Sequence, residues 1–552
     1  MIDHVVRKAR QSISWIGIVV ILCLSYGFLL TNPSIGIDDE NFDFYFKYHG
    51  IVSQGRWGSW VTSKYVDTYK YLPFWRDFLA IILLTVAAVI LVCTLEYVTG
   101  KKIGTFLSTV LVGIVIAYPI TAKNFVYIDN SVEVALCIFL SAAACFCYEL
   151  AGENKIYYLT LLLALTLGVG YIENTVVYFG CEICLLGFLK EKGSFLKRYI
   201  VPAGFALVSV VLSKGIGRLI AKGLGMPYSS YADASYVKWG DIHSFDEFRT
   251  ALSNIFAACR DCFNRYFSVR VFALCCVIWI GILIYELIKL RISRAVGALG
   301  LVLLSVGMYL VTMNSALPLR IFSSNYLCVA GACLVVVAFI EGRLAQSGGR
   351  KLTGKGILPA EASPEAGQTA QTVLPDEGLR QKQSGRSWIA VIWRILALVL
   401  VIWLFVVFTR ESNEFFALDY KRYLRDADVA RNVNRDIMKL TGSTAVETPV
   451  VFLGQPSFTE DLMVDGEYAL VTIYSNNDSG ESIRIHRFMD MLGYHYETVL
   501  GEDNTIFNYG EFVSHPMTAK AKELASDLPS YPEDGYVAQG DGFIVVKLGE
   551  YH

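Results

Sequence analysis

FLAIILLTVAAVILVCTLEYV, residues 78 to 98, is an apolar stretch of the length that crosses a bilayer. A helix rises about 1.5 Å per residue, so about 20 apolar residues span the hydrocarbon core. Ten further runs near this length lie at residues 14–31, 103–122, 131–150, 156–172, 174–189, 199–217, 268–288, 295–313, 322–340 and 388–408. We therefore expect a mainly α fold, a polytopic transmembrane helix bundle of about eleven spans. The polar break from Tyr171 to Asn174 separates two short spans, and ten spans would result if it did not.

The composition agrees with a membrane protein. Of the 552 residues, 54% are hydrophobic and only 18% are charged, which is more apolar than an average soluble domain. The formal net charge of −2 provides no basic field for a polyanion. We therefore expect the lipid bilayer as a partner and no nucleic acid.

Lysine and arginine in the short connections set the orientation. Basic clusters recur at every second junction, at residues 7–10, 101–102, 190–198, 289–294 and 343–351. Such clusters stay on the cytoplasmic side of a membrane. We expect a multi-pass membrane protein with a cytoplasmic N-terminus. The bundle, residues 1–345, then presents two large outer loops, residues 32–76 and 218–266.

The composition changes after residue 345. Residues 346–387 are rich in Gly, Pro, Gln and Ala, which predicts a disordered cytoplasmic linker. Residues 388–409 predict the last transmembrane helix. Residues 410–552 combine a helical pattern near 420–440 with strand-like runs at 449–453, 468–474 and 542–548. This mixture predicts a small C-terminal extracytoplasmic α/β domain.

Three consecutive carboxylates, Asp38, Asp39 and Glu40, stand where the first span reaches the outer surface. An aromatic stretch, residues 42–48, follows them and suits a helix at the level of the lipid headgroups. One acid would suffice to cap such a helix. Adjacent carboxylates repel one another, a cost tolerated where a base or a cation site is needed. The spacing alone leaves capping and chemistry both open.

The opening span, the acidic residues, the aromatic stretch and the segment Gly55–Trp60 together resemble the start of the Gtr type II family, membrane glucosyltransferases that modify bacterial O-antigen. The segment Tyr171–Asn174 is similar to the Tyr-Gln element of that family, with Gln replaced. The resemblance implies a GT-C glycosyltransferase of a bacterial plasma (inner) membrane. Such an enzyme would move a hexose, glucose by family default, from a polyprenyl-phosphate donor to a cell-surface polysaccharide.

The resemblance also implies where the chemistry lies. The catalytic acid of such an enzyme is in the first outer loop, so Asp38 or Asp39 is the expected base and Glu40 an accessory. A phosphate is a good leaving group and needs cations rather than a general acid. The cation candidates near outer ends are Arg320, Arg56, Lys123 and Arg218. Arg320 could instead be an interfacial arginine that snorkels, and Arg56, which is flanked by Trp57 and Trp60, could stack at the interface.

Sugar or acceptor binding is expected at Glu133, Glu173, Tyr171 and Trp57. A carboxylate inside a span is costly against lipid, so Glu133 and Glu173 should face a cavity or a polar partner. Asp38 and Asp39 could hold a divalent cation, which the sequence does not decide. A transporter or flippase of lipid-linked glycans is the alternative function, although the chain shows no repeated halves.

Overall fold

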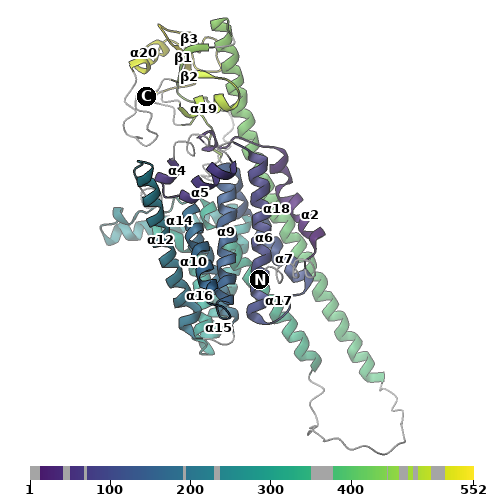
Figure 1. Ribbon diagram of the computed structural model, residues 1–552. Helices are drawn as coiled ribbons and strands as arrows, with labels where there is room; N and C mark the ends of the chain where they lie inside the picture. The colour runs from purple at the N-terminus through teal and green to yellow at the C-terminus, as the bar shows by residue number, and fades with distance from the viewer. Residues whose placement is uncertain are drawn as a thin grey trace, which may run out of the picture.

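The computed structural model describes residues 13–41, 50–67, 71–190, 194–228, 237–349, 377–443, 446–458, 470–475, 483–498 and 516–551. Figure 1 shows a long bundle of helices with a smaller α/β domain at one end. Helix α18 runs along the bundle and continues into that domain. The mainly α fold with a C-terminal α/β domain is confirmed.

Within the described residues, eight helices are long and apolar enough to cross a membrane. They are α6 (Pro73–Thr99), α7 (Thr105–Ala117) with its short continuation, α9 (Ile128–Leu150), α12 (Val201–Gly223), α15 (Phe267–Ile288), α16 (Ile292–Thr312), α17 (Asn325–Gly349) and α18 (Glu377–Thr441). Three shorter apolar helices are α2 (Trp15–Thr31), α10 (Ile156–Tyr171) and α11 (Thr175–Leu189). The count of eleven is reached only when these short helices are included. The protein is a multi-pass membrane protein.

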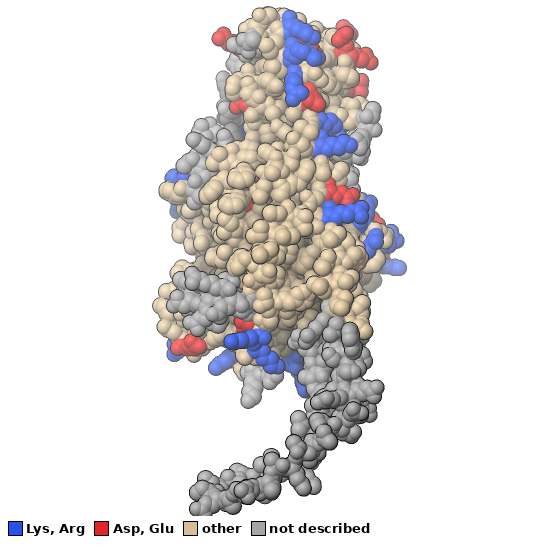
Figure 2. All heavy atoms as spheres, turned by 90° about the vertical axis from the view of Figure 1, so that its right-hand side faces the viewer, with Lys and Arg blue, Asp and Glu red and all other residues tan. Residues whose placement is uncertain are grey.

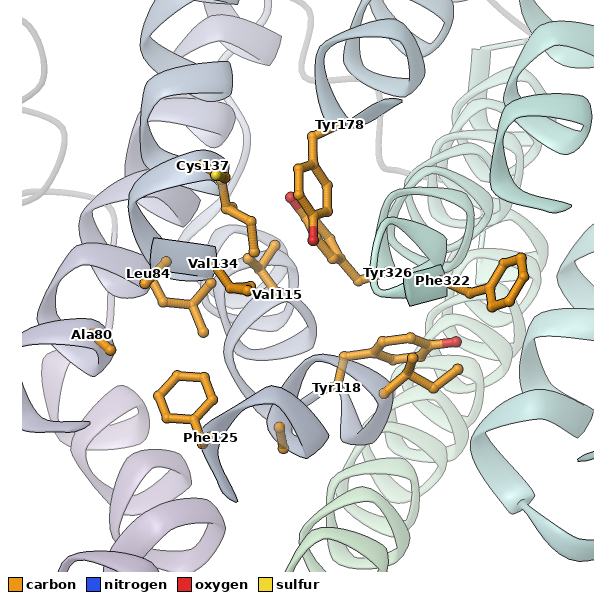
Figure 3. Packing of buried hydrophobic residues seen from close by; sticks show 14 of the residues in the cluster. Ala80, Leu84, Val115, Tyr118, Phe125, Val134, Cys137, Tyr178, Phe322 and Tyr326 are labelled. Atoms are coloured by element: carbon orange, nitrogen blue, oxygen red, sulfur yellow. The ribbon is translucent and has the colours of Figure 1, made fainter. Parts of the chain in front are cut away.

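Helices α6, α7 and α9 form the interior of the bundle. Figure 3 shows Leu84 of α6, Val115 of α7 and Val134 of α9 directed toward a shared core. All three are buried. Helices α12 and α15 instead expose apolar side chains such as Leu207 and Val277. Exposed aliphatic faces of this kind are stable against lipid and not against water.

Figure 1 shows the short helices α4 (Gly50–Ser53) and α5 (Trp57–Thr62) at the end of the bundle toward the α/β domain. The other short elements of the described bundle are η1 (Asp39–Asn41), η2 (Ser63–Asp67), α8 (Pro119–Ala122), η3 (Lys123–Val126), η4 (Leu196–Ile200), η5 (Trp239–Asp241) and η6 (Leu319–Phe322). Helix α14 (Phe245–Arg265) is longer and precedes α15. Helix α7 ends before Pro119 because proline lacks a backbone donor and disfavours helical geometry in the preceding residue. The expected interfacial helix over residues 42–48 lies outside the described residues.

The C-terminal domain contains a four-stranded sheet in the order β2-β1-β4-β3. Its elements are β1 (Val446–Leu453), α19 (Ile483–Met491), β2 (Tyr496–Thr498), α20 (Pro516–Ala525), β3 (Val537–Gln539) and β4 (Ile544–Lys547). Strand β1 pairs in parallel with β2 and β4, whereas β3 is antiparallel to β4. The strands predicted at 449–453 and 542–548 are confirmed as β1 and β4.

The strand predicted at 468–474 is wrong over its described part, residues 470–474, which form turns. The backbone N–H of Ile473 donates to the carboxylate of Asp426 at 2.9 Å, and the hydroxyl of Thr472 donates to the same carboxylate. Hydrogen bonds to α18 replace the ladder of a sheet. The buried Ile473 and Tyr474 explain the apolar pattern without a strand.

Helix α18 joins two segments that the sequence predicts separately, the last span and the helical pattern near residues 420–440. It begins at Glu377, and α17 extends to Gly349, so helices at both ends shorten the linker predicted at 346–387. Residues 350–376 lie outside the described residues. Continuity of α18 couples the C-terminal domain mechanically to the bundle.

Candidate active site

The acidic loop, residues 33–41, follows α2 and packs onto the segment that leads into α9. Asp38 has a positive φ of 79°, which is uncommon outside glycine. The buried carboxylate of Asp39 accepts the backbone N–H of Gly36 at 2.8 Å. A Cβ at Gly36 would lie 2.7 Å from the carbonyl oxygen of Val126. Close approach of two backbones therefore fixes the loop.

Arg484, from α19 of the C-terminal domain, contacts two of the three acids. Its Nη2 lies 3.1 Å from Oδ1 of Asp38, and its Nε lies 3.1 Å from Oε1 of Glu40. Figure 1 shows α19 on the side of the domain that faces the bundle. One planar guanidinium thus bridges two carboxylates, a geometry that lysine cannot reproduce. The sequence did not lead us to expect this residue at the site.

The three carboxylates differ in environment. The side chain of Asp38 is 39% exposed, whereas Asp39 and Glu40 are buried. Burial raises the pKa of Glu40 to about 7, the charge of Arg484 acts to lower it, and the charge of Asp38 raises it again. Asp38 is therefore the acid that a substrate can reach, and Glu40 exchanges its proton near neutral pH.

Helix α18 holds the other side of the acidic loop. Buried Arg422 donates to the carbonyl oxygen of Ile35 at 2.6 Å and pairs with Asp419 at 3.0 Å and Asp426 at 3.3 Å. The hydroxyl of Ser34 donates to Asp419. The loop is thus held by a buried ionic network as well as by Arg484.

Two predicted cations, Arg320 and Arg56, reach the beginning of α9. Nη1 of Arg320 donates to the hydroxyl of Tyr127 at 2.9 Å, and its guanidinium carbon lies 4.2 Å from the centre of that ring. Nη1 of Arg56 lies 3.4 Å from Oδ1 of Asn130. Val126, which contacts Gly36, directly precedes Tyr127. The structure therefore gathers both arginines and the acidic loop onto residues 126–130.

The other two predicted cations contact aromatic rings elsewhere. Buried Lys123 places its ammonium 3.7 Å from the ring centre of Tyr266 and 4.7 Å from that of Phe415, toward α15 and α18. Arg218 of α12 lies 5.6 Å from the ring of Tyr228. A Cβ at Gly55 would contact Tyr228 as well, so Arg218 belongs to the surroundings of the loop that carries Arg56.

The predicted sugar-binding side chains have protein partners. Glu133 pairs with Arg76 at 2.6 Å, and both are buried. The hydroxyls of Tyr171 and Thr62 lie 2.5 Å apart. Nε1 of Trp57 donates to Ser213 at 3.0 Å. Glu173 lies half-buried in the turn between α10 and α11. The expectation that Glu133 faces a polar partner is confirmed, and the partner, Arg76, was not foreseen.

The donor set does not fit a resident divalent cation. Asp38 and Glu40 already bind Arg484, and Asp39 accepts a backbone N–H. Among the described residues, no group of three or more His, Cys, Asp or Glu side chains could hold a metal ion. Hard cations such as Ca²⁺ need several oxygen ligands free of competing cations.

The bundle and its site together define a multi-pass membrane protein with a cluster of acids and arginines at the end that carries the α/β domain. Residues 27–339 match the family Glucosyl transferase GtrII, and the chain belongs to this family. It is therefore a glycosyltransferase, as the resemblance implied. No curated protein and no solved structure matches the chain significantly. The matched region contains the acidic loop, Arg56 and Arg320 but ends before α18 and Arg484.

Proposed function

We propose that the protein transfers a glucosyl group from a polyprenyl-phosphate donor to a hydroxyl of a surface glycan, on the outer side of a bacterial plasma membrane. The observation that carries this proposal is the contact of Arg484 with Asp38 and Glu40. Arg320 and Arg56 add two cations at Tyr127 and Asn130, which follow the residue on which the acidic loop packs. A lipid-borne anionic donor needs such cations next to a base at the membrane surface. Family membership supports the glucosyl group.

Asp38 is the proposed general base, because its carboxylate is the most accessible of the three. It takes the proton of the acceptor hydroxyl while that oxygen forms a bond to the anomeric carbon. The bond between the anomeric carbon and the phosphate oxygen breaks, and the electron pair leaves with polyprenyl phosphate. Arginine guanidinium groups stabilise the charge that develops on the departing phosphate.

Arg484 has two roles in this proposal. While it pairs with Asp38, its guanidinium contacts the carboxylate oxygen that would take the acceptor proton. A donor phosphate competes for the same guanidinium, because phosphate and carboxylate present similar paired oxygens. Donor binding then releases Asp38 for the acceptor proton. Asp38 is therefore available as a base only when the donor is bound, so the acceptor hydroxyl is not deprotonated in a site without donor.

The orientation follows from the distribution of charge at the two ends. The basic residues Lys101, Lys190 and Arg294 line one cavity with Thr99 at the end of α6. The acidic loop lies near the beginning of α6, because the hydroxyl of Tyr71 donates to the carbonyl oxygen of Ser34 at 2.7 Å. This distribution supports a cytoplasmic basic end and an outward-facing site. Figure 2 shows a face that is largely free of charged residues across its middle, as a lipid-embedded surface requires.

The experiment measures transfer of labelled glucose from a polyprenyl-phosphate donor in membranes. Asp38→Asn should lower transfer at least about 100-fold, because Asn cannot accept the proton. Asp428→Asn, at an exposed position on α18, is the control for a lost surface carboxylate. Arg484→Lys should raise the KM for donor, since lysine cannot bridge two acids. Near-normal turnover of Asp38→Asn would exclude it as the base.

A further inference from the structure

A second charged region lies at the end of the bundle opposite the acidic loop. Helix α6 begins near that loop and ends at Thr99, which lines a cavity of about 1090 Å³. The cavity lies among the α6–α7 connection, the ends of α9 and α11, the beginnings of α12 and α16, and α17. The proposed transfer reaction does not use it.

The lining of this cavity is strongly basic. Among the described residues, six cations line it, Lys101, Lys102, Lys190, Lys197, Arg198 and Arg294, and one carboxylate, Glu149. Lys190 pairs with Glu149 at 2.6 Å, and Arg294 pairs with Glu286 at 3.5 Å, which leaves an excess of positive charge around the cavity. Like charges gathered around one concavity repel each other and are stabilised by a bound anion.

Four helices have first-turn residues in the described lining of the cavity. They are α7, α10, the helix formed by η4 (Leu196–Ile200) with α12, and α16. A helix N-terminus carries partial positive charge and disfavours a cation in its first turn. Lys197, Arg198 and Arg294 nevertheless occupy first turns. An anion would satisfy the helix ends and the side chains together.

Arg198 is the second, independent observation. It is only 5% exposed, and its Nη1 donates to the carbonyl oxygen of Gly187 and the hydroxyl of Ser293. Its buried Nε finds no acceptor in the part of the chain that the structure describes. A buried charged donor without an acceptor is costly, so the position suits a ligand oxygen.

The same cavity has an apolar wall. Leu95, Leu107, Phe188, Leu334 and Val335 contribute to its lining beside the cations. A free phosphate would have no use for this wall, whereas an amphiphile would place its head on the basic groups and its chain along the aliphatic surface. The ligand chemistry is therefore that of a lipid with an anionic head.

We propose that this cavity binds the phosphate group of a membrane lipid, with Arg198, Arg294 and the Lys101–Lys102 pair around the head. Two lipids share this chemistry, a polyprenyl phosphate and an anionic glycerophospholipid of the bilayer. The site is independent of the proposed transfer reaction, because it lies at the other end of the helices.

Native mass spectrometry of the full-length protein can test this site with three probes: phosphatidylglycerol, phosphatidylcholine and a polyprenyl phosphate. The protein should retain phosphatidylglycerol or polyprenyl phosphate in preference to phosphatidylcholine. Whichever of these two anionic lipids binds more tightly is the class of lipid that occupies the cavity. Arg198→Gln should weaken retention about tenfold, as expected for a lost charge-assisted hydrogen bond. Lys101→Gln with Lys102→Gln should do the same from exposed positions that cannot unfold the bundle.

Arg291→Gln is the matched control. Arg291 and Arg294 both pair with Glu286, at 3.8 and 3.5 Å, but only Arg294 lines the cavity. Retention should therefore be unchanged in Arg291→Gln. The proposal would be wrong if phosphatidylcholine were retained as well as the two anionic lipids, or if both cavity variants retained them as the wild type does. The cations would then be interfacial anchors without a lipid site. If an equal concentration of inorganic phosphate displaced the lipid fully, the apolar wall would contribute nothing to binding, and the ligand would be an anion rather than a lipid.

Discussion

The carboxyl group of Glu40 is buried, and burial raises its pKa to near neutral pH. Its pKa in the folded protein is about 7, raised mainly by burial from an ordinary value of 4.5. Between pH 4.5 and about pH 7, Glu40 is more protonated in the folded state than in the unfolded state, so the free energy of unfolding falls as pH rises. This decrease is complete above about pH 7 and amounts to about 3 kcal/mol at most.

Glu40→Gln should remove this pH dependence, because the amide does not titrate. Thermal unfolding in detergent from pH 4 to 8 should show the wild type losing stability relative to the variant as pH rises. The variant also loses the ion pair between Glu40 and Arg484, which the wild type forms only when Glu40 is ionised. Parallel curves for the two proteins would mean that the pKa of Glu40 is not raised in the folded protein.

A substitution at Arg320 can show whether the planar shape of its guanidinium or only its charge is needed for donor binding. Its guanidinium both donates to the hydroxyl of Tyr127 and lies over that ring. Arg320→Lys keeps the charge but loses the planar fork that suits phosphate. We expect kcat/KM for the donor to fall about tenfold or more. Arg249→Lys, at an exposed position on α14, should leave kcat/KM unchanged. Equal activity of both variants would indicate a purely electrostatic role for Arg320.

Among the elements, α18 shows how a buried ionic network stabilises a loop distant in sequence. Arg422 and Asp419 form a pair three residues apart in the interior, and Arg431 and Asp428 form one with the same spacing on the surface. Arg422→Met leaves Asp419 and Asp426 as buried charges and should cost about 3–5 kcal/mol. Arg431→Met should cost less than about 1 kcal/mol. Denaturant titration of both variants measures the difference.

These ion pairs on α18 also show what the sequence can and cannot predict. The apolar runs predicted the helices well, since about 20 residues and a lipid environment leave few alternatives. Acids and arginines three or four residues apart on α18 are visible in the sequence, but which pair is buried is not. Arg484 contacts Asp38 across more than 400 residues, a pairing that no local pattern encodes. A basic pair on one face of α19, Arg484 and Arg487, was the available signal.

At the scale of the whole molecule, the C-terminal domain lies over the acidic loop rather than beside it as a separate module. The sequence predicts that residues 410–552 fold independently and either help to position a large acceptor or shape the outer cavity, without supplying the base. The contact of α19 with η1 adds a direct link to the site through Arg484. The domain should therefore affect transfer to every acceptor, large or small.

Truncation after Thr441 tests this, because it retains the full length of α18 while removing Arg484. Transfer to a small soluble acceptor should fall by about the same factor as in Arg484→Gln, since both changes remove the same guanidinium from Asp38 and Glu40. Transfer to the large native glycan should fall further, and the excess measures contacts between the glycan and the domain. Insertion is checked by a reporter fused to the end of α18, which should be extracytoplasmic in both proteins. Wild-type transfer to the small acceptor by the truncated enzyme would show that the acidic loop works without Arg484, and the domain would then serve acceptor binding alone.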